Sequence, residues 1–158
     1  MANSSFFKET KNVYWPGEYA DIVNMLQGMD GNGESTHPPM YKYNTSPLIL
    51  AAAIGLFHGR YRENADLGSS RKEINTDIFE GHKFGNSELT SFIALISVLG
   101  KGDIELLREG NESEILKVFQ SYAIGGLEYL RGSLSNSSDT SGQQILFDEI
   151  QKIRDSKR

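Results

Sequence analysis

Imidazoles are the first candidates for chemistry, because the 158-residue chain contains three histidines and no cysteine. The lack of cysteine removes thiol nucleophiles, disulfides and thiolate metal sites. His37, His58 and His82 form no His-x-x-x-His pair, and none has a carboxylate beside it at a metal-binding spacing. We therefore predict no metal site and no cofactor.

Motifs for nucleophilic and phosphate chemistry are also missing from the sequence, so no catalytic residue is predicted. Ser69 and Lys72 match Ser-x-x-Lys, but they lie in a predicted loop without the motifs that accompany such a pair. The segment 30–34 has calcium-ligand residues, yet Ser35 and Tyr41 stand where a calcium loop needs glycine and glutamate. One enzymatic alternative stays open, a site of unfamiliar type assembled in space from His58, Glu80, His82 and Arg60.

The densest basic region of the sequence lies at and beyond the end of one predicted helix. Its members are His58, Arg60, Arg62, Arg71 and Lys72. Such a group can bind a phosphate or an acidic partner. The helix dipole alone also favours cations at a C-terminus, which gives His58 and Arg60 a structural explanation. The positive charge is diluted by the nearby acidic residues Glu63, Asp66 and Glu73.

Aromatic side chains gather in the two least regular segments, as Tyr14, Trp15, Tyr41 and Tyr43. Exposed aromatics can stack on bases or anchor a protein interface, and they can equally fold onto a helical core. Tyr41 and Tyr43 belong to a predicted loop at 28–45, which is long for a small domain and so is either mobile or functional. We predict one interaction surface that joins these two tyrosines to His58, Arg60 and Arg62.

Helical periodicity dominates the rest of the chain. Helices are predicted at 18–27, 48–58, 74–80, 87–99, 103–108, 111–134 and 142–155. The predicted start signals are Ser46-Pro47, Asn75 or Thr76, Ser87, Asp103, and Asn111 with Glu114. The fold class is therefore all-α, a compact bundle of about five main helices with one or two short ones. Residues 1–16 are predicted to form an N-terminal arm, and 17–158 a single helical domain.

The helix at 47–58 is apolar on every side, which predicts a central helix buried all round. Gly125 and Gly126 lie inside another predicted helix, where each glycine costs roughly 1 kcal/mol relative to alanine. Close packing against the small side chains Ala51 and Ala52 would offset that cost. A ligand cavity or a functional kink at the glycine pair is the alternative.

The bulk composition restricts the class of protein. A net charge of −5 argues against a surface that binds polyanions as a whole, although it leaves a local basic patch open. The longest apolar run, 48–57, is far shorter than the roughly 20 residues that span a bilayer. The first eleven residues lack the pattern of a signal peptide. We expect a cytoplasmic protein without a membrane span.

The run from Val118 to Glu128, VFQSYAIGGLE, resembles a segment of the small Dnd-system-associated proteins (protein 4 type) encoded beside DNA phosphorothioation gene clusters. An earlier small-residue helix ending in Gly and Arg is also typical of them, and 51–60 is similar to it. The resemblance covers roughly 47–134 and leaves the N-terminal 45 residues and the last helix unmatched. It implies a setting in bacterial anti-phage defence built on sulfur-modified DNA, and no catalytic residue.

These observations favour a non-enzymatic accessory protein that binds a partner protein of that system. Direct DNA binding by the arginines, in a regulatory role, is the alternative, and strong salt dependence would distinguish it. The oligomeric state stays open, because an amphipathic last helix is a common dimerisation element.

Overall fold

The computed structural model describes residues 7, 9, 11–26, 45–80, 83–84, 87–135 and 142–156. Its helices are α1 (Ala20–Leu26), α2 (Thr45–His58), α3 (Thr76–Glu80), α4 (Leu89–Lys101), α5 (Glu112–Ser135) and α6 (Gly142–Asp155), with 3-10 turns η1 (Gly17–Tyr19) and η2 (Ile104–Leu107). The strands are β1 (Asn12–Trp15), β2 (Lys72–Asn75), β3 (Lys83–Phe84) and β4 (Ser87–Glu88). The mostly helical class predicted from the sequence is confirmed.

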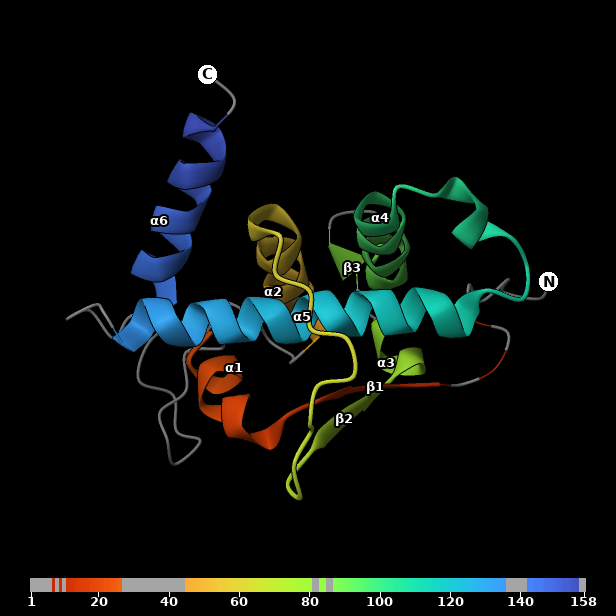
Figure 1. The fold of residues 1–158 in the computed structure, drawn as a ribbon, viewed down its shortest axis with the longest axis horizontal. Helices are drawn as coiled ribbons and strands as arrows, with labels where there is room; N and C mark the ends of the chain where they lie inside the picture. The colour runs from red at the N-terminus through yellow and green to blue at the C-terminus, as the bar shows by residue number, and fades with distance from the viewer. Residues whose placement is uncertain are drawn as a thin grey trace.

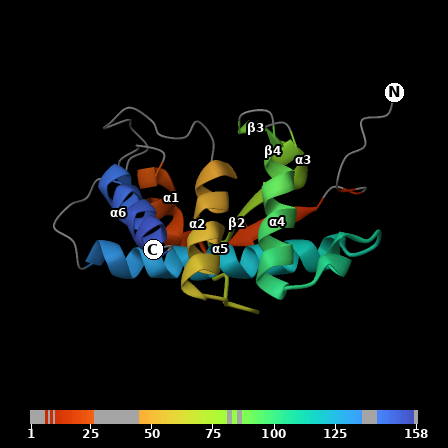
Figure 2. The ribbon, with the colours of Figure 1, turned by 90° about the horizontal axis from the view of Figure 1, so that it is seen from above.

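Helix α5 is the axis of the molecule. Figure 1 shows α2, α4 and α6 on one side of it, and α1, β1 and β2 on the other. The view from above shows α2 and α4 lying beside one another across α5 (Figure 2). Ile115, Phe119, Leu127 and Leu130 line the buried side of α5, so the core forms where both layers meet this helix.

The crossing of α2 and α5 brings backbone against backbone. A Cβ atom at Gly126 would overlap the carbonyl oxygen of Ala51, and one at Gly55 would overlap that of Tyr122. Gly125 instead lies against the backbone of Arg60, just beyond α2. Because only glycine leaves this space empty, the glycine pair fixes how closely α2 and the chain after it approach α5.

A small β-ribbon departs from the all-α prediction. β1 pairs antiparallel with β2, with Asn12 opposite Asn75 and Trp15 opposite Lys72. Val13 and Trp15 turn inward and are buried, whereas residues 12 and 14 are half-buried. Four residues of alternation are too short to predict a strand, and β2 occupies what we expected to be an irregular connection and the start of a helix. A second pair, β3 with β4, is shorter still. The division into an arm at 1–16 and a domain at 17–158 stays a prediction.

Two predicted helix starts carry the expected side-chain caps, whereas α2 begins at Thr45, one residue before the predicted Ser46-Pro47 start. Asp103 accepts a hydrogen bond from the Glu105 amide at the start of η2, and Asn75 accepts one from Asp77 at α3. Ser87, however, lies in β4, and α4 begins after Glu88, so the predicted cap is wrong. The side-chain amide of Asn111 donates to the Glu105 carbonyl, which ties the start of α5 to the preceding turn.

Burial departs from the expected pattern on three helices. Central helix α2 exposes Ala53 and Phe57, so it is not buried all round. Leu99 of α4 and Ile150 of α6 occupy apolar positions of amphipathic helices, yet both are exposed. Helical spacing identifies an apolar side chain but not whether a neighbour covers it. Within the described part of the chain, no helix is both long and apolar enough to cross a membrane.

Candidate functional site

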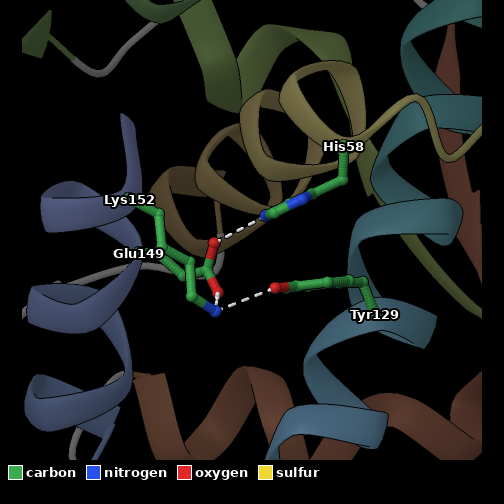
Figure 3. Close-up of polar contacts among 4 residues, drawn as sticks. All are labelled: His58, Tyr129, Glu149 and Lys152. Atoms are coloured by element: carbon green, nitrogen blue, oxygen red, sulfur yellow. Dashed lines mark hydrogen bonds and ion pairs between the residues drawn. The ribbon is translucent and has the colours of Figure 1, made fainter. Parts of the chain in front are cut away.

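The last residue of α2, His58, points toward Glu149 of α6 (Figure 3). Its Nε2 lies 2.7 Å from the Glu149 Oε2 atom. Glu149 is only 3% exposed, although its neighbours along α6 lie largely in solvent. An ionised carboxylate accepts but cannot donate, so His58 Nε2–H is the donor of this bond.

Two further side chains complete what we call the junction cluster, defined as His58, Tyr129, Glu149 and Lys152. Lys152 Nζ donates to Glu149 Oε1 at 3.0 Å and to the Tyr129 hydroxyl at 3.1 Å. The Tyr129 ring stacks on the His58 ring with centroids 4.0 Å apart and planes 19° apart. Helices α2, α5 and α6 thus each contribute at least one member, as Figure 3 shows.

The electrostatics of the junction cluster favour its charged form. Burial raises the pKa of Glu149, but hydrogen bonds with His58, Lys152 and Tyr129, together with the Lys152 charge, outweigh burial and lower the pKa below its ordinary value. Hydrogen bonds to Tyr129 and Glu149 raise the pKa of Lys152. Both shifts mean that the folded surroundings favour the ionised forms of Glu149 and Lys152.

Chemically, the junction cluster links α6 to α2 and α5 through polar side chains, and α6 also packs against α1. Both oxygens of Glu149 are engaged by donors, which leaves this carboxylate poorly suited to accept a substrate proton. No group of three or more metal-ligand side chains occurs within the described residues. The four side chains therefore form a satisfied polar network of the kind that fixes one arrangement of helices.

Beside this cluster lies an open cavity of about 360 Å³, lined by Arg60, Glu128, Tyr129, Gly132 and Ser133. The Arg60 guanidinium lies 5.9 Å from the centroid of the Tyr129 ring. Phe57 is 40% exposed and packs edge-on against His58. The exposed Arg60 side chain therefore lines this hollow, whereas Phe57 is not part of its lining.

The basic residues singled out from the sequence are separated by the fold. His58, Arg60 and Arg62 lie at the α2 end, where Arg62 Nε pairs with Glu128 at 3.1 Å. Arg71 lies over the Tyr14 ring at 4.8 Å, and Lys72 lies in β2, on the other side of α5 from α2 (Figure 1). The five cations therefore do not form one continuous patch.

Other candidates lie outside the described residues, namely His37, His82, Tyr41, Tyr43 and the loop that carries the two tyrosines. The enzymatic cluster proposed around His58 included Glu80, but the carboxylate bound to His58 is Glu149. Sequence reasoning missed Glu149. The available signal was its position between Ile145 and Ile153 at i−4 and i+4, which places a carboxylate on an apolar stripe.

Fold and site together define a mostly helical protein whose conspicuous polar cluster holds helices together. The family model of DNA sulphur modification system-associated protein 4 matches residues 12–157, so the chain belongs to this family. The match is wider than the resemblance at 47–134, and it includes β1 and the whole of α6. Comparisons with curated proteins and with solved structures give no match.

Proposed function

We propose that the chain is a non-enzymatic, cytoplasmic accessory protein of a bacterial DNA phosphorothioation-linked defence system, and that it acts by binding a partner protein of that system. Membership in a family associated with DNA sulphur modification supplies the setting. The observation that carries the binding proposal is the exposed Arg60 side chain, which lines the open cavity beside the Tyr129 ring.

The backbone of Arg60 is fixed by contacts on both sides of its Cα atom. Its amide donates to the Gly55 carbonyl at 2.7 Å, and its carbonyl fits against Gly125. The side chain is exposed and forms no ion pair with another described residue. A fixed backbone lowers the entropic cost of binding, and arginine and aromatic side chains dominate the energy of many protein interfaces.

The junction cluster supports a binding role over a catalytic one. Its carboxylate is buried, and both of its oxygens are engaged, one by His58 and one by Lys152, so its chemistry is used to position α6. An acidic side chain of a partner placed in the cavity would meet the Arg60 guanidinium, and an aromatic one would meet Arg60 and the Tyr129 ring.

Direct DNA binding is the second candidate, and the exposure of Arg60, Arg62, Arg71 and Lys72 favours it. Three observations weigh against it. Arg62 is paired with Glu128, Arg71 and Lys72 lie across α5 from Arg60, and the net charge is −5. Duplex binding depends on several cations that neutralise neighbouring phosphates, so separated and paired arginines serve it poorly.

The test is titration of the purified chain against each other protein of the same system. We expect Arg60→Ala to weaken the productive complex by at least about tenfold. Arg71→Ala is the matched control, because Arg71 is also an exposed arginine near a tyrosine but lies on the β1–β2 ribbon. Equal losses for both variants would contradict the proposed surface.

A mobility-shift assay on plain and phosphorothioate-containing duplexes, at two salt concentrations, separates the two candidates. Salt-sensitive binding that disappears in the double variant Arg60→Ala/Arg62→Ala would establish the DNA-binding alternative. The accessory-protein proposal expects no shift at micromolar protein.

A further inference from the structure

The open cavity to which we assign partner binding has an acidic residue in its own lining. Arg60 and Glu128 both line this cavity of about 360 Å³. The Glu128 side chain is 41% exposed, and it forms no ion pair with Arg60 in the described part of the chain. A carboxylate beside a cation normally competes with an acidic ligand for that cation. Whatever holds Glu128 away from Arg60 therefore decides whether the cavity can bind an acidic group.

The Glu128 carboxylate is held by Arg62. Its Oε2 atom lies 3.1 Å from Arg62 Nε. The backbone of Arg62 is itself fixed against α5, because its amide donates to the Ser121 carbonyl at 3.1 Å. Arg62 is not part of the cavity lining. The Arg62 guanidinium thus offsets the charge of Glu128 without filling the space in which a partner would bind.

Two other cations near this end of α5 are engaged by different acceptors. Arg131 follows Glu128 by three residues, but it donates to both carboxylate oxygens of Asp21, at 2.9 and 2.7 Å. Lys152 is held within the junction cluster. Among the residues that the structure describes, Arg62 is the cation paired with Glu128. No second cation is therefore placed to take over this role when Arg62 is removed.

We propose that Arg62 is a positioning residue of the partner-binding cavity, and that it keeps Glu128 from capturing Arg60. Without Arg62, the Glu128 carboxylate would turn to Arg60 and compete with an acidic side chain of the partner. The inference rests on the proposed binding at Arg60, and it adds the class of group that binds. Because Arg62 offsets Glu128, the cavity presents one uncompensated positive charge, which matches a single carboxylate.

Thiol labelling inside the cavity measures its charge without knowledge of the partner. The chain has no cysteine, so Ser133→Cys places a single thiol in the cavity lining. Iodoacetate and iodoacetamide react with the same thiolate and are similar in size, but only iodoacetate is an anion. The ratio of the two reaction rates therefore reports how strongly the cavity attracts a carboxylate, because changes in the reactivity of the thiol itself cancel.

In the Ser133→Cys chain, we expect Arg62→Ala to lower the iodoacetate-to-iodoacetamide ratio by about threefold to fivefold, the size expected of an exposed ion pair. Glu128→Gln should change the ratio little while Arg62 is present, and it should restore the ratio once Arg62 is replaced. Arg62→Lys keeps the charge and should keep most of the ratio. Arg108→Ala is the matched control, since Arg108 is an exposed arginine paired with Glu105 outside the lining.

The comparison of single and double variants separates pairing from a simple addition of charges. If Glu128→Gln raised the ratio equally with and without Arg62, the two charges would act independently and the inference would be overturned. A ratio that falls with Arg60→Ala but not with Arg62→Ala would overturn this inference alone and leave the proposed surface standing. A ratio that Arg60→Ala leaves unchanged would contradict the proposed surface as well.

Discussion

At Gly126 the backbone of α5 meets the backbone of α2, whereas three residues later, at Tyr129, α5 meets α6 through hydrogen-bonded side chains. The first contact depends on the absence of a Cβ atom, and neither pH nor salt changes it. The second depends on an ionised carboxylate and its donors, which water can replace. We infer that the glycine crossing sets the fold, and that the junction cluster sets whether α6 stays attached.

The largest effect is expected from Gly126→Ala. The new Cβ would overlap the Ala51 carbonyl, and a backbone atom cannot rotate away, so we expect a loss of about 3 kcal/mol in the free energy of unfolding. Urea denaturation measures it. Gly132→Ala in the same helix is the control, because no atom lies within 4 Å of its added Cβ. That variant should gain up to about 1 kcal/mol from helix propensity. Equal stability of the two variants would refute the close crossing.

Glu149→Ala should have the next largest effect. It removes the acceptor of His58 Nε2–H and one of the two acceptors of Lys152, and we expect a loss of about 2 kcal/mol in the free energy of unfolding. Denaturation followed by circular dichroism measures the loss. Asp155→Ala is a control on the same helix, because Asp155 is exposed and its ion pair within the described part of the chain is with its neighbour Arg154 at 3.5 Å. A loss as large in Asp155→Ala would point to general weakening of α6 and not to the junction.

The pH dependence follows from the lowered pKa of Glu149. A carboxyl group whose pKa is lower in the folded state adds stability above its unfolded pKa, and that contribution disappears as pH falls through the folded value. We therefore expect the stability difference between the native chain and Glu149→Gln to be full at pH 7 and to shrink below the ordinary value of 4.5. Parallel denaturation curves at pH 7, 5 and 3.5 measure this difference. A gap that stays constant with pH would contradict an ionised Glu149.

Arg62→Ala should have the smallest effect. The Arg62–Glu128 pair is exposed on both sides, and such pairs contribute between zero and about 1 kcal/mol. Denaturation at low and high salt measures this contribution, and salt should remove most of it. A loss of stability comparable to that of Glu149→Ala would mean that the exposed Arg62–Glu128 pair contributes as much as the junction cluster, which would contradict this ranking.

How well the sequence predicts each helix or strand depends on the length of its run of periodic apolar residues. Long amphipathic or apolar runs predicted α5, α2 and α6 within a few residues, and the start of η2 followed from Asp103. The β1–β2 ribbon was missed because four residues carry too little alternation. Its inward side chains, Val13 and Trp15, are identified only once β2 lies beside them.

The candidate site shows the same limit more sharply. Cationic residues near the end of α2 were visible in the sequence, and so was the oddity of two glycines inside a helix. The carboxylate that binds His58 is 91 residues away along the chain, and no local pattern links the two. Equally, the fold carries Arg71 and Lys72 across α5, which spacing along the sequence could not indicate. The junction cluster therefore forms through contacts between distant parts of the chain, which motif spacing cannot predict.

Hydrogen exchange of the native chain and of Glu149→Gln at pH 7 tests most directly whether the junction cluster attaches α6 as a separate unit. We expect faster exchange confined to 142–156, with α2 and the buried middle of α5 unchanged. Faster exchange in α2 and α5 to the same extent, or none in α6, would contradict it.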